Sequence, residues 1–130
     1  MHKATTVLAA MSPFPHTVEA HEALAAAKAV MDTHDIHHVP VLDGDALVGL
    51  LTSADLARAG GGTVGDACHR DVLVVDVHRA LASACREMAA RRVDAALVTK
   101  DGHLAGILTV SDVCRFLADL LDPDLDDEIA

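Results

Sequence analysis

Some stretches of this chain have hydrophobic residues at helical spacing, and others have short apolar runs on either side of a turn. The same order of stretches occurs twice. Apolar residues recur every three or four positions over about 20–34 and about 77–92, which predicts a helix in each stretch. Each helix is preceded by a short helical turn and a brief extended piece, at 6–11 and 16–18 in the first case and at 63–68 and 72–75 in the second. Asp76 is the expected N-cap of the second helix.

Two pairs of strands follow, each joined by a tight turn. The predicted strands are 38–42 and 46–51 around Asp43-Gly44-Asp45, and 95–99 and 103–108 around Lys100-Asp101-Gly102. Asp-Gly between apolar runs is a strong hairpin signal. A closing helix is predicted after Thr52 and after Thr109. Because a strand–helix–strand unit crosses over to a parallel neighbour, each half should form a three-stranded sheet with its helices on one side.

The two halves read as copies of one unit. A shift of 57 residues aligns Ala23-Leu24-Ala25 with Ala80-Leu81-Ala82 and the segment 49–55 with 106–112, without a gap. We expect a first repeat at 1–58, a Gly-rich linker at 59–62, a second repeat at 63–118 and an acidic C-terminal tail at 119–130. The predicted fold class is α+β, with two βαββα repeats packed sheet to sheet about a pseudo-twofold axis.

Composition narrows the range of functions. The chain has 130 residues, 52% of them apolar, a net charge of −10, two Phe and no Tyr or Trp. Nucleic-acid binding is not expected, because it needs a basic surface and, for single strands, aromatic stacking platforms. No apolar run approaches the roughly 18 residues of a membrane span, and the start lacks a signal-peptide core. Three widely spaced cysteines are typical of free thiols, so we expect a cytoplasmic protein without a membrane partner.

The sharpest motif is Gly-φ-φ-Thr-x-x-Asp, where φ is an apolar residue, at the end of the last strand of each half. Thr52 with Asp55, and Thr109 with Asp112, have the spacing of a helix capping box. The same geometry also suits a ligand, because a helix N-terminus offers donors to phosphate and a carboxylate can accept both hydroxyls of a ribose. The residues alone leave both interpretations open.

The order of these motifs, together with Ile36-His37-His38-Val39-Pro40-Val41 before the first hairpin, resembles a tandem pair of cystathionine-β-synthase (CBS) domains, or Bateman module, over about 6–118. The resemblance implies a regulatory module with two clefts between the repeats. It implies an adenosine-containing ligand such as AMP, ADP, ATP, S-adenosylmethionine or NAD, with no required cofactor and no catalytic residue. It also implies a homodimer that signals to an unknown effector protein.

The resemblance also assigns candidate binding residues. In the family the Asp of the Thr-x-x-Asp motif holds the ribose and the Thr or Ser contacts phosphate or ribose, while an opening Thr and an apolar residue from the opposite repeat line the base. The corresponding residues here are Asp55, Thr52, Thr63 and Val93 in one cleft, and Asp112, Thr109, Ser111, Thr6 and Ile36 in the other.

The two clefts should differ in charge. The first repeat has His37-His38 just before its central strand, where family members that bind phosphate often place His or Arg, and the second repeat has Asp94-Ala95. On the assumption that Asp94 faces its own cleft, the Asp55 cleft is expected to be the better site for a charged nucleotide. The Asp112 cleft is then expected to be empty or to take a nucleoside-like ligand.

Two other functions stay open at this stage. The first is a ligand-free dimerisation or protein-interaction module, in which Thr52, Asp55, Thr109 and Asp112 are helix caps alone. The second is a metal site built from the histidines, but the spacing of His34, His37, His38 and Cys68-His69 matches no recognised zinc pattern, so no metal is expected.

Overall fold

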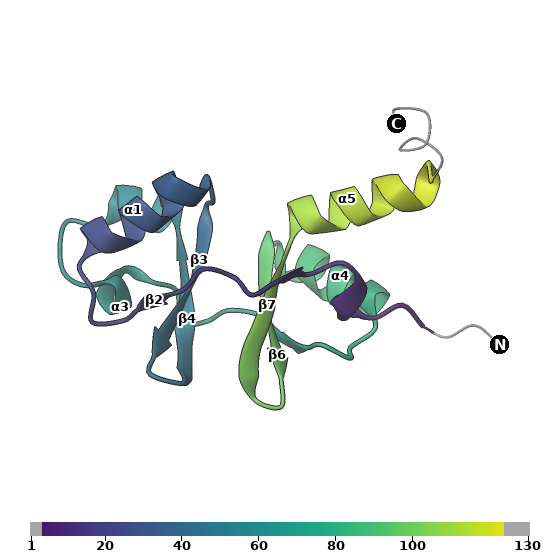
Figure 1. Cartoon of the computed structure of the whole chain (residues 1–130), viewed down its shortest axis with the longest axis horizontal. Helices are drawn as coiled ribbons and strands as arrows, with labels where there is room; N and C mark the ends of the chain where they lie inside the picture. The colour runs from purple at the N-terminus through teal and green to yellow at the C-terminus, as the bar shows by residue number, and fades with distance from the viewer. Residues whose placement is uncertain (1–3, 124–130) are drawn as a thin grey trace.

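The computed structural model describes residues 4–123 and shows two similar halves side by side (Figure 1). In the first half, β2 (Val18–Glu19) lies parallel to β3 (His38–Asp43), which pairs antiparallel with β4 (Ala46–Thr52). Helix α1 (Leu24–His34) connects β2 to β3, and α2 (Ser53–Arg58) follows β4. This half is therefore the predicted three-stranded unit.

The second half repeats this arrangement and adds one strand. Its elements are β5 (Val74–Asp76), α4 (Leu81–Arg91), β6 (Ala95–Lys100), β7 (His103–Thr109) and α5 (Val110–Leu121). The sheet order is β1-β7-β6-β5, because the short strand β1 (Ser12–Pro13) from the start of the chain pairs antiparallel with β7. This strand was not predicted, since two residues leave no periodic pattern to recognise.

The opening turn of each repeat packs on the other half of the molecule. The turn η1 (Val7–Ala9) bonds through the Val7 N–H to the carbonyl of Arg79, at 2.9 Å. The equivalent helix α3 (Val64–Ala67) bonds through the Val64 N–H to the carbonyl of Glu22, also at 2.9 Å. Val7 is accordingly buried in the core under α4, and Val64 in the core under α1.

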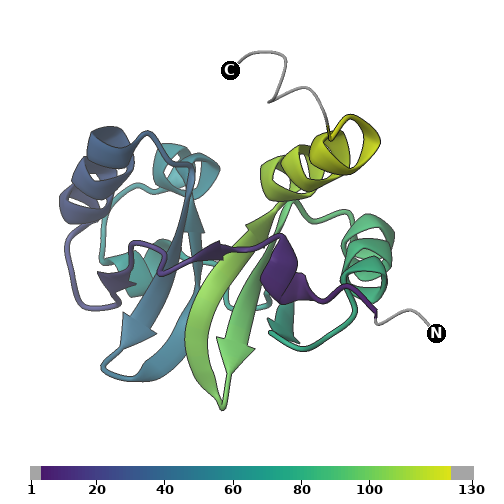
Figure 2. The same ribbon diagram turned by 45° about the vertical axis from the view of Figure 1, so that its right-hand side comes forward.

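The two sheets face one another across the centre, with the helices outside (Figure 2). Side chains on β4, β6 and β7 alternate between the two sides of their sheets, as a period of two requires. Leu51, Ala96 and Leu108 pack under the helices, whereas their neighbours Leu50, Leu97 and Ile107 form an apolar layer between the sheets. This layer fixes the two repeats against each other, as expected for an α+β pair packed sheet to sheet.

The prediction that Asp76 caps the second helix is wrong. Asp76 ends β5, and its carboxylate accepts the His78 backbone N–H at 2.8 Å. The helix begins four residues later than predicted, with Ala80 at its N-cap and no side-chain cap. The Leu81 N–H instead donates to the carbonyl of Thr5 at 2.8 Å, so the opening segment of the other repeat supplies the acceptor.

The predicted acidic tail also begins too early. Residues 119–121 belong to α5, which ends at Leu121, and residues 124–130 lie outside the described part of the chain. The boundaries 1–58, 59–62 and 63–118 stay sequence-based predictions. In space, the opening segments are exchanged between the two halves.

Candidate ligand-binding cavities between the repeats

Two cavities of similar size lie between the repeats, one beside each Thr-x-x-Asp motif. The first, of about 470 Å³, has Thr52, Arg58 and His69 in its wall and is called the Asp55 cavity here, because Arg58 and His69 bond to the Asp55 carboxylate. The second, of about 490 Å³, is lined by Thr109, Ser111, Asp112 and Arg115, and is called the Asp112 cavity. Both combine residues from the two halves of the molecule.

The Asp55 carboxylate is buried, with its side chain 2% exposed, and is fully hydrogen-bonded. One oxygen, Oδ1, accepts from Arg58 Nη2 at 2.8 Å and lies 2.7 Å from His69 Nε2. The other oxygen, Oδ2, accepts the Thr52 backbone N–H at 2.9 Å, and the Thr52 hydroxyl accepts the Asp55 N–H at 3.1 Å. Thr52 and Asp55 thus form the expected capping box at the start of α2.

The Asp112 carboxylate occupies the equivalent position in the second repeat, and one of its hydrogen-bond partners differs from those of Asp55. Its Oδ1 accepts from the Ser12 hydroxyl at 2.8 Å and from Arg115 Nη1 at 3.2 Å. Its Oδ2 accepts from the Thr109 N–H at 2.9 Å and the Thr109 hydroxyl at 3.0 Å. Ser12 and His69 are 57 residues apart, the offset of the repeat, so a hydroxyl in one cavity stands where an imidazole stands in the other.

His37 and His38 line both cavities, at the boundary between them. His38 Nε2 lies 3.3 Å from the Asp94 carboxylate, and His37 Nδ1 lies 3.0 Å from the Ser53 hydroxyl. Asp94 lines the Asp55 cavity. The assumption behind the predicted charge difference is therefore wrong, because Asp94 follows Val93 into the cavity of the opposite repeat.

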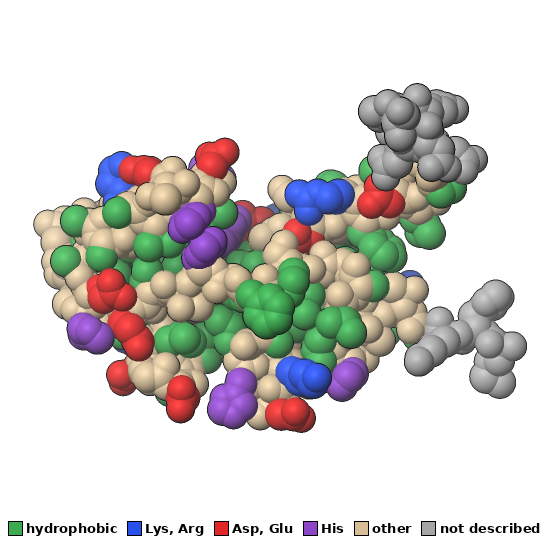
Figure 3. Space-filling view, viewed as in Figure 1, with side chains coloured by type: hydrophobic (Ala, Val, Ile, Leu, Met, Phe, Trp, Pro, Cys, Tyr) green, Lys and Arg blue, Asp and Glu red, His purple; other side chains and the backbone are tan. Residues whose placement is uncertain are grey.

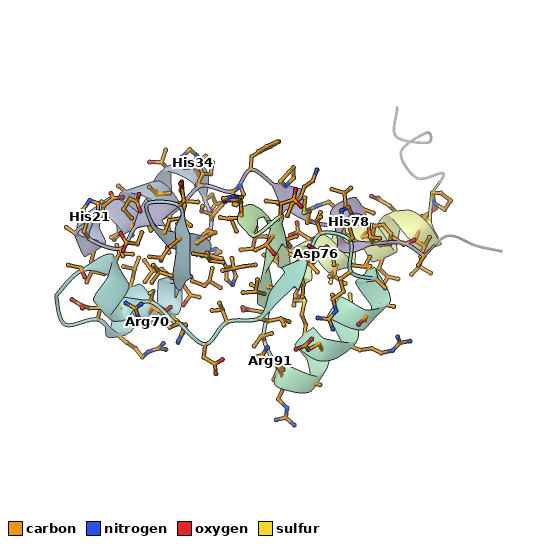
Figure 4. The ribbon with its side chains drawn as sticks, turned by 90° about the horizontal axis from the view of Figure 1, so that it is seen from below. His21, His34, Arg70, Asp76, His78 and Arg91 are labelled. Atoms are coloured by element: carbon orange, nitrogen blue, oxygen red, sulfur yellow. The ribbon has the colours of Figure 1, made fainter. Side chains whose placement is uncertain are left out.

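A second pair of histidines lies at the mouth of the Asp112 cavity. The rings of His16 and His34 are stacked, with centroids 3.6 Å apart and planes inclined by 11°. His16 lines the cavity, and His34 is in the last turn of α1 (Figure 4). Histidine side chains gather on the surface over the boundary between the two halves (Figure 3).

The predicted site residues divide into those in the cavities and those outside. Val93, Thr52, His37 and His38 line the Asp55 cavity, and Ile36, Thr109, Ser111 and Asp112 line the Asp112 cavity. Thr6, Thr63 and Asp55 line neither cavity, although Asp55 contacts the lining residues Arg58 and His69. Thr63 caps α3, where its hydroxyl accepts the Asp66 N–H at 3.3 Å, and Thr6 forms an isolated bridge with Ala80. The opening segments reach the opposite repeat as expected, but Thr6 and Thr63 lie further from its Thr-x-x-Asp motif than the family resemblance implies.

Sequence reasoning missed many residues of the cavities, among them Ser12, Phe14, Arg58, His69 and Arg115. Arg58 and Arg115 left a signal, since both follow the motif Asp by three residues and align under the repeat offset. Ser12, Phe14 and His69 left none, because a long-range strand pairing brings them to the cavities.

The described residues hold no obvious metal centre. Between residues 4 and 123 no three His, Cys, Asp or Glu side chains come together in an arrangement that could bind a metal ion. All three cysteines are free thiols. Burial raises the pKa of the Cys68 and Cys85 thiols above the usual value. No helix in the same span is long and apolar enough to cross a membrane.

The comparison with known proteins agrees with this geometry. A family model for the CBS domain matches the chain twice, over residues 6–62 and 64–119. The chain belongs to the CBS domain family. It is 30% identical over 106 residues to hypoxic response protein 1 of Mycobacterium tuberculosis (strain H37Rv), and the match covers 75% of this chain and 74% of that protein. The crystal structure of CBSX2 in complex with AMP has a TM-score of 0.79 and 26% identity, and covers 88% of this chain and 97% of that one.

The CBS pair also occurs inside longer proteins. This chain is 30% identical over 100 residues to inosine-5′-monophosphate dehydrogenase of Thermoplasma acidophilum, and the match covers 75% of this chain but 21% of that enzyme. The shared part is thus the CBS pair, and the two repeats found here from the sequence are the two domains of that pair.

Proposed function

We propose that this CBS pair is a cytoplasmic regulatory module that reversibly binds an adenosine-containing ligand in a cavity between its repeats. The ligand class is AMP, ADP, ATP, S-adenosylmethionine or NAD. The observation that carries this proposal is the pair of buried carboxylates, Asp55 and Asp112, each beside an inter-repeat cavity and at the start of a helix. The AMP complex of CBSX2 supports it.

The chemistry of the cavity walls fits such a ligand. A carboxylate accepts hydrogen bonds from two adjacent ribose hydroxyls, and the neighbouring arginine can bond to phosphate. Apolar side chains of the opposite repeat, Val93 in one cavity and Ile36 in the other, provide a surface for the base. A ligand held in this way contacts both repeats, and it stabilises whichever arrangement of the repeats it binds more tightly. The proposed role is regulation by binding, with no catalytic residue and no required cofactor.

Helix α5 offers a route for the signal. It begins at the Asp112 cavity and carries a stripe of Val110, Cys114, Leu117 and Leu121, spaced alternately four and three residues apart and all exposed. This spacing is typical of a helix that packs on another helix. We propose that a second copy of the chain, as a homodimer, or an effector protein covers this stripe and responds to the ligand.

A ligand-free dimerisation or interaction module is the second candidate, and one observation favours it. Thr63 and Asp66 form a third capping box, with the Thr63 N–H donating to the Asp66 carboxylate at 3.0 Å, outside both cavities. The hydrogen bonds of Thr63 lower the pKa of Asp66. The Thr-x-x-Asp motif thus also caps a helix of this chain at a place outside the Asp55 and Asp112 cavities.

The third capping box provides a matched control for the test. We expect Asp112→Asn or Asp55→Asn to weaken binding of AMP or S-adenosylmethionine by about tenfold or more, because a charged acceptor for the ribose is lost. Asp66→Asn should leave ligand binding unchanged. Thermal shift with each ligand measures both binding and stability.

The opposite result would support the second candidate. In that case all three variants lower the melting temperature to a similar extent, and no ligand raises it in the wild-type protein. The chain has no Trp or Tyr, so a nucleotide that co-purifies would also appear directly as an absorbance band near 260 nm, released on heating.

A further inference from the structure

A third cavity lies on the helix side of the first repeat, between α1 and α2. It has a volume of about 740 Å³ and is called the α1–α2 groove here. Its wall is mostly apolar, ends at Gly60 and Gly61 just after α2, and includes neither the Thr nor the Asp of a Thr-x-x-Asp motif. Helices α1 and α5 lie on the same side of the molecule (Figure 1 and Figure 2). A single partner on that side can therefore contact the groove and α5 together.

The groove exists on a helix face that is filled in the second repeat. Three small residues of this face line the groove: Ser53, Ala57 and Gly60. The repeat offset of 57 residues aligns them with three larger, exposed residues of α5: Val110, Cys114 and Leu117. Helix α2 also ends at Arg58, whereas α5 continues past the equivalent Arg115 to Leu121. The first repeat is thus hollow at the positions where the second repeat projects.

The charges on the two faces are opposite in sign. Three charged residues line the α1 side of the groove, and two of them, Lys28 and Asp32, form an ion pair at 2.6 Å. The third, Asp35, leaves this side with a net negative charge. The repeat offset aligns Asp35 with the exposed Arg92 at the end of α4, and it aligns Lys28 and Asp32 with neutral residues. Opposite charges across an interface favour the pairing of the two surfaces, and like charges oppose it.

We infer that a second copy of this chain covers the groove, with the exposed stripe of α5 of each copy lying in the α1–α2 groove of the other. The two copies then meet head to tail, first repeat against second, in a closed twofold dimer with two equivalent contacts. Large residues meet small ones in this arrangement, and the negative face meets the positive one. A head-to-head pair would oppose the large residues to one another and leave both grooves empty, which loses packing contacts. The inference rests on the homodimer of the proposed function and adds its surface and orientation.

The natural Cys114 in the stripe allows a direct test of the orientation. Ala57→Cys adds a thiol at an exposed position in the groove, and Ala25→Cys repeats the test from the α1 wall. After mild oxidation, we expect a disulfide between the introduced thiol and the partner's Cys114, seen as a dimer on a non-reducing gel and as a linked peptide pair by mass spectrometry. Ala54→Cys, an exposed position of α2 outside the groove, is the matched control and should give no such pair.

Sedimentation of the unoxidised protein tests the same contact. The wild-type chain should form dimers as its concentration rises, and Cys114 stays exposed in dilute solution, where the chain is a monomer. Leu117→Asp should raise the dissociation constant of the dimer by at least about tenfold. Ala57→Leu should raise it by about tenfold, because it fills the groove. Leu8→Asp, at a 55% exposed position on η1, is the matched control and should change it less than about twofold.

The outcomes separate this inference from the proposed function. A disulfide between Cys114 and the partner's Cys114 in the oxidised wild-type protein, or a dimer that Ala57→Leu does not weaken, overturns the head-to-tail arrangement and leaves the proposed homodimer intact. The same holds if neither Ala57→Cys nor Ala25→Cys links to the partner's Cys114. A wild-type chain that stays a monomer up to about 1 mM overturns the inference and the homodimer together. Binding of an adenosine-containing ligand, measured by calorimetry, is independent of all these results.

Discussion

At the scale of single residues, the cavities depend on two charged groups inside the protein. Within residues 4–123, Asp55 and Asp112 are the charged side chains that are buried. Each keeps its charge satisfied through the backbone of its own helix cap and through a partner from a distant segment. Ser12, for example, lies 100 residues from Asp112 in the sequence. The caps follow from a local motif and were predicted, whereas the distant partners depend on tertiary structure and were not.

Two glycines, Gly49 and Gly106, let the opening segments pass close to the sheets. A side chain at Gly49 would place its Cβ 2.1 Å from the carbonyl oxygen of His69. We expect Gly49→Ala to lower the free energy of unfolding by about 1–3 kcal/mol, because a backbone group must move. Gly60→Ala is the control, with nothing within 4 Å, and should stay within about 0.5 kcal/mol of the wild type. Urea denaturation measures both, and equal stability of the two variants would contradict the close approach.

The three thiols should differ in reactivity. Burial raises the pKa of Cys68 and Cys85, so less of each is thiolate at pH 8, whereas Cys114 is exposed on α5. Iodoacetamide at pH 8 should therefore modify Cys114 first, and raising the pH should speed the modification of the other two. Peptide mass spectrometry reads the order, with Cys114→Ser as the control. Modification of Cys68 before Cys114 would contradict the burial of Cys68.

At the scale of elements, the hairpin strands β3, β4, β6 and β7 were predicted to within a residue, and so were the starts of α2 and α5, whereas β1 and the starts of α1 and α4 were not. The Asp-Gly turns fix the hairpins locally, and Asp101 and Gly102 both have the positive φ that a tight hairpin turn needs. The starts of α1 and α4 instead depend on the exchanged opening segments, one of which gives the Leu81 N–H its acceptor. A local pattern cannot reveal a partner that lies in the other repeat.

This exchange of opening segments makes a prediction about stability. Val7 and Val64 are completely buried in the cores of the opposite repeats, while Leu8 beside Val7 is 55% exposed. We expect Val7→Ala and Val64→Ala each to cost about 2 kcal/mol of unfolding free energy. Leu8→Ala removes a larger side chain and should cost less than either. If thermal or urea unfolding shows a larger loss of stability for Leu8→Ala than for Val7→Ala, the packing of η1 is contradicted.

At the scale of the whole molecule, the pseudo-twofold pair could be predicted from the internal repeat, but the difference between its two cavities could not. Family resemblance indicated which motif faces a cleft. It did not reveal that Asp94 enters the Asp55 cavity, because that depends on how the two sheets face each other. The sequence repeat therefore predicted the architecture, and the structure was needed to decide which side chains of one repeat meet the motif of the other.

The central claim is that an inter-repeat cavity binds an adenosine-containing ligand. The most direct measurement is isothermal titration calorimetry of the wild-type chain with AMP, ADP, ATP, NAD and S-adenosylmethionine in turn. The account predicts saturable binding of at least one of them that Asp112→Asn or Asp55→Asn weakens and Asp66→Asn does not. Absence of saturable heat with all five ligands would contradict the account and leave Thr52, Asp55, Thr109 and Asp112 as helix caps.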